Sequence, residues 1–259
     1  MTQPNYAYLD SLGASQVFFP RRDPVGPPPG ANDIAIEVEP GISIGARYYH
    51  HQPDAPSILY FHGNGEVASD HDDIAPLYHA IGCNLFVAEF RGYGRSDGSP
   101  SFEHLVTDAR AVCAAFHALL DEWSFGQQRF VMGRSLGSHC ALEIGANATE
   151  RLQGIIIESG SSGIERLLQR LGASDSMAGQ ELRTQHDDKL RSIDLPVLII
   201  HGEQDDLVPI AQAETLQGLL QHTTVTFERI HGAGHNDLLW RGQTQYFAAI
   251  AKHLNSGQA

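Results

Sequence analysis

The chain of 259 residues contains 17 Lys and Arg against 31 Asp and Glu, which gives a formal net charge of −14. Hydrophobic residues make up 42% and charged residues 19%, the balance of a globular protein rather than a disordered one. Because nucleic acids and anionic membrane surfaces repel an acidic protein, this charge argues against both as main partners.

The first part of the chain predicts a lead-in followed by short strands. Residues 1–33 are expected to be irregular, since residues 23–30 are rich in proline and glycine. A hairpin over 34–39 and 42–49 is expected next, with its turn at Pro40-Gly41. Further short apolar strands are predicted over residues 57–62, 84–90, 129–132, 154–158, 196–201 and 223–230.

Helical segments separate these strands. Within 100–123 apolar residues recur at steps of three and four, which indicates one helix face, with Ser99 as the expected N-cap and Pro100 as the first helical residue. Short strands that alternate with helices predict an α/β fold. We expect a mostly parallel eight-stranded sheet with helices on both faces and the antiparallel hairpin at one edge. The other helices are predicted over residues 136–146, 210–220 and 237–254.

Residues 161–195 break the alternation, because they are too long for a single crossover helix. They are polar apart from a stripe that contains Ile164, Leu167 and Leu171. We expect a small lid of one or two helices inserted in a domain over 34–259. A decorated crossover between two strands is the open alternative.

The cysteines and the N-terminus bear on the cellular compartment. The 3 cysteines form no CxxC pair, and their odd number suits a reducing environment. Residues 1–13 contain no Lys or Arg and no long apolar run, so no signal peptide is expected. No apolar run approaches the roughly 20 residues that span a bilayer. We therefore expect a cytoplasmic protein without a membrane span, and a monomer by default.

The pattern G-x-S-x-G occurs at Gly133-Arg-Ser135-Leu-Gly137, between a predicted strand and a predicted helix. A serine on so sharp a turn has strained backbone, and small residues two positions away on either side avoid a clash. The turn would expose the serine hydroxyl and point the first amides of the helix at developing negative charge. Ser135 is therefore the candidate nucleophile, and the backbone N–H of Leu136 is a candidate oxyanion donor.

Three further positions complete a possible catalytic set at the ends of strands. A glycine-rich turn after strand 57–62 offers the backbone N–H of Asn64 as the second oxyanion donor. Asp205 follows a later strand, and His235 lies in a glycine-rich loop after the last one. Ser135, Asp205 and His235 thus come in the order nucleophile, acid and base. A histidine that a carboxylate orients can take and return the serine proton.

Other side chains compete with these or add to them. Asp206 and Glu158 are rivals of Asp205 for the role of the acid. Arg134 and Glu158 are also candidate substrate-binding residues, since an arginine beside the nucleophile could attract an anionic group, although ion pairs that brace loops are the alternative. Metal-ligand residue types occur at His50-His51 and at His71-Asp72-Asp73, but no H-E-x-x-H or paired cysteine spacing supports a site, so no metal is expected.

Taken together, the motifs resemble those of the α/β-hydrolase superfamily over about residues 34–254. The chain is similar to the single-domain serine hydrolases of the esterase and acyl-protein depalmitoylating branch. This resemblance implies hydrolysis of a carboxylic ester or thioester of a small-molecule or acyl substrate, through an acyl-enzyme on Ser135 and without a cofactor. The matching pieces are His62-Gly-Asn-Gly65, Phe90-Arg-Gly-Tyr-Gly-Arg-Ser96, Gly133-Arg-Ser-Leu-Gly137, His201-Gly-Glu-Gln-Asp205 and Gly232-Ala-Gly-His235-Asn236.

Alternatives from other classes stay open. A peptidase or amidase and a carbon–carbon bond hydrolase could use the same triad. The fold also serves non-catalytic binding proteins.

Overall fold

The computed structural model describes residues 3–147, 149–161 and 163–256. Four parts of the chain lie outside the described residues. They are 1–2 in the expected lead-in, 162 in the expected lid, and 148 and 257–259 in the rest of the expected domain. Within these ranges the strands form an eight-stranded sheet with the order β1-β2-β4-β3-β5-β6-β7-β8. They are β1 (Ala31–Glu39), β2 (Ile42–Tyr49), β3 (Ser57–Phe61), β4 (Asn84–Ala88), β5 (Arg129–Arg134), β6 (Gly154–Glu158), β7 (Val197–Gly202) and β8 (Val225–Ile230).

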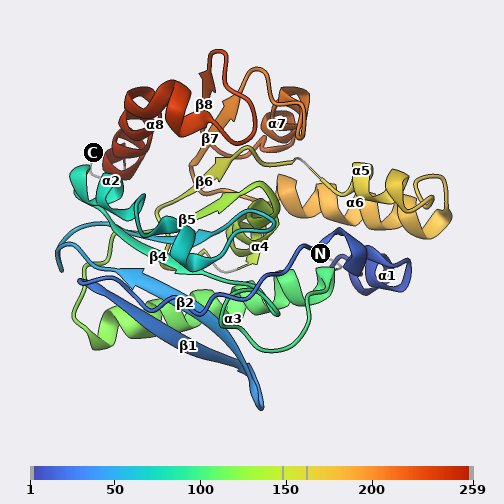
Figure 1. The fold of residues 1–259 in the computed structure, drawn as a ribbon. Coiled ribbons are helices and arrows are strands. Elements are labelled where there is room, and N and C mark those ends of the chain that lie inside the picture. The colour runs from blue at the N-terminus through green and yellow to red at the C-terminus, as the bar shows by residue number, and fades with distance from the viewer. Residues whose placement is uncertain (1–2, 148, 162, 257–259) are drawn as a thin grey trace.

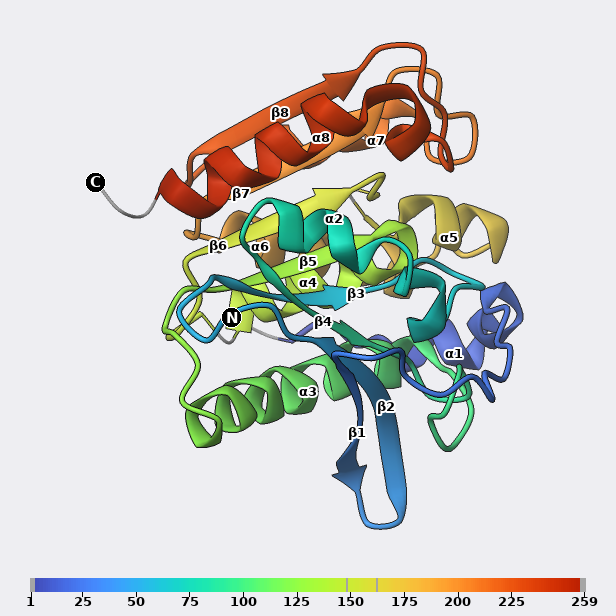
Figure 2. The same cartoon turned by 60° about the vertical axis from the view of Figure 1, so that its left-hand side comes forward.

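The strand directions confirm the predicted sheet. β1 pairs with β2 and β2 with β4 in antiparallel fashion, whereas the strands from β4 across to β8 run parallel. Every residue of β3, β4, β6 and β7 is buried, which explains why these strands are apolar runs without alternation. In Figure 2 the arrowheads of β3, β6 and β8 point to the same side, so this side is the carboxyl edge of the sheet.

Helices cover both faces of the sheet (Figure 1). One apolar core gathers side chains from α3, α4, α6 and α7, and the other gathers them from α2 and α8. Successive residues of β3 point to opposite cores, with Leu59 and Phe61 in the first and Ile58 and Tyr60 in the second. The helices are α1 (Ala7–Ser11), α2 (Ala75–Ala80), α3 (Phe102–Glu122), α4 (Ser138–Asn147), α5 (Glu165–Arg170), α6 (Met177–Arg191), α7 (Ile210–Leu219) and α8 (Leu238–Asn255).

The N-terminal segment is more ordered than its sequence predicts. The segment 1–33 contains the helix α1, a 3-10 turn η1 (Ala14–Val17) and the start of β1 at Ala31. Tyr6 and Leu9 are buried in the core that α3 lines. Five residues are too few for a helical period to stand out, so packing rather than local pattern explains this element.

The start of α3 also differs from the prediction. Ser101, not Ser99, is the N-cap, and its hydroxyl accepts a hydrogen bond from the N–H of His104 at 3.1 Å. Pro100 therefore precedes the helix instead of beginning it. The carboxylate of Asp10 also accepts the N–H groups of the first two helical residues at 2.7 and 2.9 Å, a contact from a distant segment that the sequence does not reveal.

The segment 161–195 contains α5 and α6, between β6 and β7. Helix α6 contacts α4 and α7, and its Leu182 and Leu190 are buried in the core. Tyr8, which lies on α1, bonds through its hydroxyl to that of Ser176 at 3.0 Å. Part of the expected lid is thus packed as a layer of the domain. That residues 161–195 form a lid separate from the rest of the domain stays a prediction.

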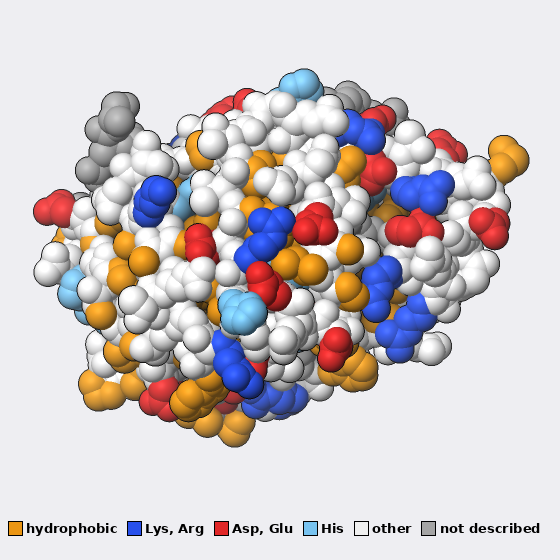
Figure 3. All heavy atoms as spheres, turned by 90° about the horizontal axis from the view of Figure 1, so that it is seen from above, with side chains coloured by type: hydrophobic (Ala, Val, Ile, Leu, Met, Phe, Trp, Pro, Cys, Tyr) orange, Lys and Arg blue, Asp and Glu red, His pale blue; other side chains and the backbone are white. Residues whose placement is uncertain are grey.

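The surface carries charges of both signs. In Figure 3 the Lys and Arg side chains lie next to Asp and Glu side chains across the visible face, without a large patch of a single sign. The ion pairs of the described residues include Arg183 with Glu165 at 2.8 Å and Arg191 with Asp188 at 2.7 Å. Across the described ranges, no helix combines the length and apolar character that a membrane crossing requires.

Candidate active site

Ser135 lies on the sharp turn that the sequence predicts between β5 and α4. Its φ of 50° is in the left-handed region, which is strained for a residue other than glycine. The turn continues into the short 3-10 helix η3 (Ser135–Gly137). A Cβ on Gly133 would lie 2.3 Å from the carbonyl oxygen of Gly137, and a Cβ on Gly137 would lie 2.1 Å from that of Phe61. Both glycines are therefore required by close backbone contacts.

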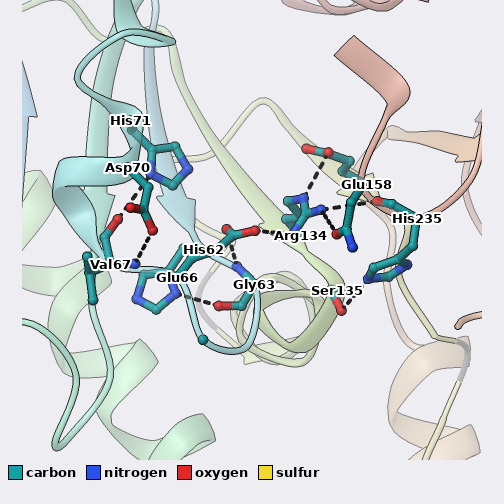
Figure 4. Close-up of polar contacts among 12 residues, drawn as sticks. His62, Gly63, Glu66, Val67, Asp70, His71, Arg134, Ser135, Glu158 and His235 are labelled. Carbon is teal, nitrogen blue, oxygen red and sulfur yellow. Dashed lines mark hydrogen bonds and ion pairs between the residues drawn. The ribbon is translucent and has the colours of Figure 1, made fainter. Parts of the chain in front are cut away.

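The structure brings Ser135, His235 and Asp205 into one chain of hydrogen bonds. Nε2 of His235 lies 3.0 Å from Oγ of Ser135, and its Nδ1 lies 2.7 Å from Oδ2 of Asp205. Figure 4 shows the ring of His235 facing the hydroxyl of Ser135. Asp205 is 4% exposed and His235 is 8% exposed, so water has little access to the bond between them. This is the geometry that a base needs to activate a serine hydroxyl.

Asp205 is held as an ionised acceptor. Its Oδ1 accepts the backbone N–H groups of Leu207 at 3.0 Å and Val208 at 2.7 Å. Burial alone would raise the pKa of Asp205, but hydrogen bonds from His201, His235 and the Val208 amide hold it below its usual value. The carboxylate can therefore fix the Nδ1–H tautomer of His235.

Neither of the two rival acids bonds to the ring of His235 in the described part of the chain. Asp206 is exposed to solvent. Glu158, which is 5% exposed, accepts hydrogen bonds from the hydroxyl of Tyr246 at 2.8 Å and from Nε of Arg134 at 3.2 Å. The acid that contacts the ring of His235 is Asp205.

Arg134 is braced by ion pairs rather than directed freely at a substrate. Its guanidinium pairs with Glu66 and with Glu158. The same group donates hydrogen bonds to the carbonyl oxygen of His235 at 3.1 Å and to Oδ1 of Asn236 at 2.8 Å. Of the two interpretations of Arg134 drawn from the sequence, the contacts favour the ion pair that braces loops.

The turn after β3 leaves an amide available. The N–H of Glu66 donates to the carbonyl oxygen of Gly63 at 3.2 Å, and Gly65 has a φ of 83°, which glycine adopts without strain. Among the described residues, the backbone N–H of Asn64 has no hydrogen-bond acceptor. Leu136 is the second residue of η3, where backbone N–H groups lack an acceptor within the helix. Both candidate oxyanion donors are thus available, and their role stays a prediction.

The side chain of Asn64 has a structural function that its sequence position does not indicate. Its Oδ1 accepts the hydroxyl of Tyr93 at 2.6 Å and the N–H of Phe19 at 2.9 Å. Its Nδ2 donates to the carbonyl oxygen of Val17 at 2.7 Å. The N-terminal segment is thus fastened to the turn after β3.

A cavity of about 340 Å³ borders His235. Its polar wall includes Glu66, His71, Arg134 and Glu158, whereas Trp240, which is 90% exposed, belongs to its apolar wall. Sequence reasoning missed Glu66 and considered His71 only as a metal-ligand type, because only the folded chain brings the two residues to the histidine loop. Within the described ranges, no group of three or more His, Cys, Asp or Glu side chains could hold a metal ion.

Comparisons with known proteins agree with this architecture. A family model described as serine aminopeptidase, S33, matches residues 52–180. Protein bem46 of Schizosaccharomyces pombe is 31% identical over 206 residues, which cover 77% of this chain and 67% of that protein. Alpha/beta hydrolase domain-containing protein 17B of Xenopus tropicalis is 28% identical over 210 residues, which cover 78% and 68%.

Among solved structures, the esterase Pf2001 of Pyrococcus furiosus superposes with a TM-score of 0.71 at 15% identity, over 93% of this chain and 97% of that one. At this identity the likeness shows the fold alone. With the bem46 match and the family model beside it, the resemblance that the motifs predict is confirmed. The chain belongs to the α/β-hydrolase superfamily.

Proposed function

We propose that the protein is a serine hydrolase that cleaves a carboxylic ester or thioester through an acyl-enzyme on Ser135. The observation that carries the proposal is the chain of hydrogen bonds from Ser135 through His235 to Asp205, at 3.0 and 2.7 Å. An ester or thioester is the first choice of substrate because the motifs resemble those of the esterase and acyl-protein depalmitoylating branch.

In the first half of the reaction, His235 takes the proton of Ser135 Oγ as this oxygen attacks the carbonyl carbon of the substrate. The backbone N–H groups of Asn64 and Leu136 donate to the oxygen that becomes negatively charged. Asp205, which is ionised, stabilises the positive ring of His235. The carbon–leaving group bond then breaks, and the leaving group receives the proton from His235.

In the second half, water replaces the leaving group. His235 takes a proton from this water as its oxygen attacks the acyl carbon, and returns the proton to Oγ of Ser135 when the acid leaves. The cavity of about 340 Å³ borders His235 and is large enough for part of a substrate. We assign it to the leaving group, because the same histidine must protonate that group.

A second candidate is a peptidase or amidase on the same triad, because the matching family model is described as serine aminopeptidase. The two reactions differ in the leaving group, which is an amine rather than an alcohol or thiol. A panel of p-nitrophenyl esters, acyl thioesters and aminoacyl p-nitroanilides separates them. The proposal expects higher kcat/KM on the esters and thioesters.

The test of the mechanism is labelling with a fluorophosphonate probe, followed by mass spectrometry of the modified peptide. We expect the label on Ser135, and loss of both label and activity in Ser135→Ala, by at least about 10⁴-fold in kcat. The matched control is Ser99→Ala, in an exposed loop, which should keep full activity. Esterase activity that survives in Ser135→Ala, or an active protein that never labels, would refute the mechanism.

A further inference from the structure

Arg134 connects three segments that meet around the nucleophile (Figure 4). It precedes Ser135 directly in the chain, at the end of β5. Its guanidinium contacts Glu66 in the segment after β3, Glu158 at the end of β6, and the loop that begins at His235. Each guanidinium nitrogen thus has a partner, and the Arg134 side chain is only 13% exposed.

The contact with Glu66 reaches the turn that contains Asn64. One carboxylate oxygen of Glu66 pairs with Arg134, and the other accepts the backbone N–H of Gly63 at 2.8 Å. The N–H of Glu66 closes the same turn by its bond to the Gly63 carbonyl oxygen at 3.2 Å. Glu66 therefore fixes the conformation of the turn on both sides of Asn64.

The turn also approaches the guanidinium closely. A Cβ on Gly63 would lie 2.5 Å from Nη1 of Arg134 and 3.0 Å from Oε1 of Glu66. A side chain at this position would have to displace the ion pair. The turn and the ion pair are thus packed directly against each other.

The opposite side of Arg134 holds the backbone of the base. Nη2 donates to the carbonyl oxygen of His235 at 3.1 Å and to Oδ1 of Asn236 at 2.8 Å. The ring of His235 must lie within hydrogen-bond distance of both Ser135 and Asp205. A shift of its backbone would lengthen at least one of these two bonds.

The charges keep the pair intact at neutral pH. Burial alone would raise the pKa of Glu66. The nearby Arg134, His71 and His62 together outweigh this effect, so the pKa lies below its usual value. Arg134 lies between two carboxylates, which favours its charged form. An anionic substrate group would have to displace one of these carboxylates to bind Arg134.

We propose that Glu66 and Arg134 act as a positioning pair that couples the oxyanion turn to the loop of the catalytic base. Their hydrogen bonds go to other groups than Oγ of Ser135 and the ring of His235, although both side chains belong to the polar wall of the cavity. Together they set the distance from the N–H of Asn64 and the ring of His235 to the carbonyl group under attack. The inference rests on the proposed function, because it assigns these positions a role in the same reaction.

A double-mutant cycle tests the pair. Glu66→Gln, Arg134→Met and the double variant are assayed on one p-nitrophenyl ester, with a fluorophosphonate labelling rate for each. Since a displacement of about 1 Å can cost on the order of 10²-fold in rate, we expect each single change to lower kcat by about 10–100-fold with KM nearly constant. The double variant should be hardly slower than Arg134→Met, because either change alone breaks the coupling.

The conservative variant separates geometry from charge. Arg134→Lys keeps the positive charge but cannot contact Glu66, Glu158 and the His235 carbonyl oxygen together. We therefore expect its kcat to stay at least about tenfold below that of the parent protein. Full rescue by lysine would contradict a positioning role for the guanidinium fork.

Arg47 offers a matched control. Its guanidinium also bridges two carboxylates and a carbonyl oxygen, those of Asp33, Asp72 and Val25, but it lies on β2, away from Ser135. Arg47→Met, Asp33→Asn and their double variant should lower the thermal midpoint. Their kcat per folded molecule should stay within about twofold of the parent protein.

The outcomes separate the alternatives. The proposal is supported if the Glu66–Arg134 pair shows coupling in kcat and in the labelling rate and the Arg47–Asp33 pair shows none. A rise in KM for anionic esters at constant kcat, or an equal loss of kcat in Arg47→Met, refutes it. If Arg134→Met does not fold, Glu66→Gln decides by the same criteria. Ser135→Ala is assayed in parallel, because activity that survives in it refutes the proposed function rather than the positioning pair.

Discussion

The change Asp205→Asn tests the candidate triad most directly, because the structure dictates how the asparagine would lie. Oδ1 of Asp205 accepts two backbone N–H groups, those of Leu207 and Val208, and only an oxygen can satisfy them. The new amide must therefore direct its oxygen to these groups and its NH₂ to Nδ1 of His235. A donor then faces Nδ1, which has to become the acceptor.

This reversal determines the size of the effect. With Nδ1 unprotonated, the neutral ring carries its proton on Nε2, and Nε2 can no longer take the proton of Ser135 Oγ at 3.0 Å. The same change in the serine protease triad lowers kcat by about 10⁴-fold, and the same geometric reason applies here. A factor of 10⁴ corresponds to about 5.5 kcal/mol in activation free energy. KM should change little, since Asp205 does not contact the substrate.

Kinetics on a p-nitrophenyl ester provide the assay, with the folded fraction of each variant measured by circular dichroism. Asp206→Asn is the matched control, since the neighbouring carboxylate is exposed and should leave kcat unchanged. A loss below about tenfold in Asp205→Asn would refute the reasoning. A larger loss in Glu158→Gln than in Asp205→Asn would assign the acid to Glu158 instead.

Two further predictions concern the turn and the pH dependence. Gly137→Ala should lower kcat by about 10²-fold, because its Cβ would lie 2.1 Å from the Phe61 carbonyl oxygen. Gly218→Ala is the control, since a Cβ there meets open space, and it should be fully active. Equal activities of the two variants would contradict the prediction. Burial lowers the pKa of His253 to about 4, so the folded protein binds fewer protons than the unfolded chain between pH 6.5 and 4. The free energy of unfolding should therefore decrease as the pH is lowered from 6.5 to 4, by up to about 3 kcal/mol from this residue. Urea titrations of His253→Leu should show a smaller decrease over the same range. An identical decrease would contradict this prediction.

The elements that the sequence predicts well are those that local composition determines. β2 and β6 have the predicted bounds, because β2 follows the turn at Pro40-Gly41 and β6 is a short run built around three isoleucines. The elbow at Ser135 could be predicted for a similar reason. Its two glycines are needed for contacts within the turn and with the end of the neighbouring strand, so they lie at a fixed spacing from the serine.

The features that the sequence does not reveal depend on contacts between distant segments. Glu66 and Arg134 are separated by 68 positions, and nothing around either residue indicates the other. The N-terminal segment reads as a loop, yet its Val17 carbonyl oxygen is bound by Asn64 across 47 positions. The candidate nucleophile is therefore visible in the sequence, whereas the side chains that position the groups around it are not.

The strained turn at Ser135 and the turn that contains Asn64 are linked by one packed contact. A left-handed backbone at a residue other than glycine costs about 1–3 kcal/mol, and it persists only where surrounding contacts leave no alternative. Here the hydroxyl of Ser138 donates to the carbonyl oxygen of Ser135 at 2.6 Å, and Gly137 lies directly against the carbonyl oxygen of Phe61 at the end of β3. The turn with Asn64 begins two residues after Phe61. The contact between Gly137 and Phe61 therefore ties the strained turn of Ser135 to the strand that leads into the turn of Asn64, the second candidate oxyanion donor.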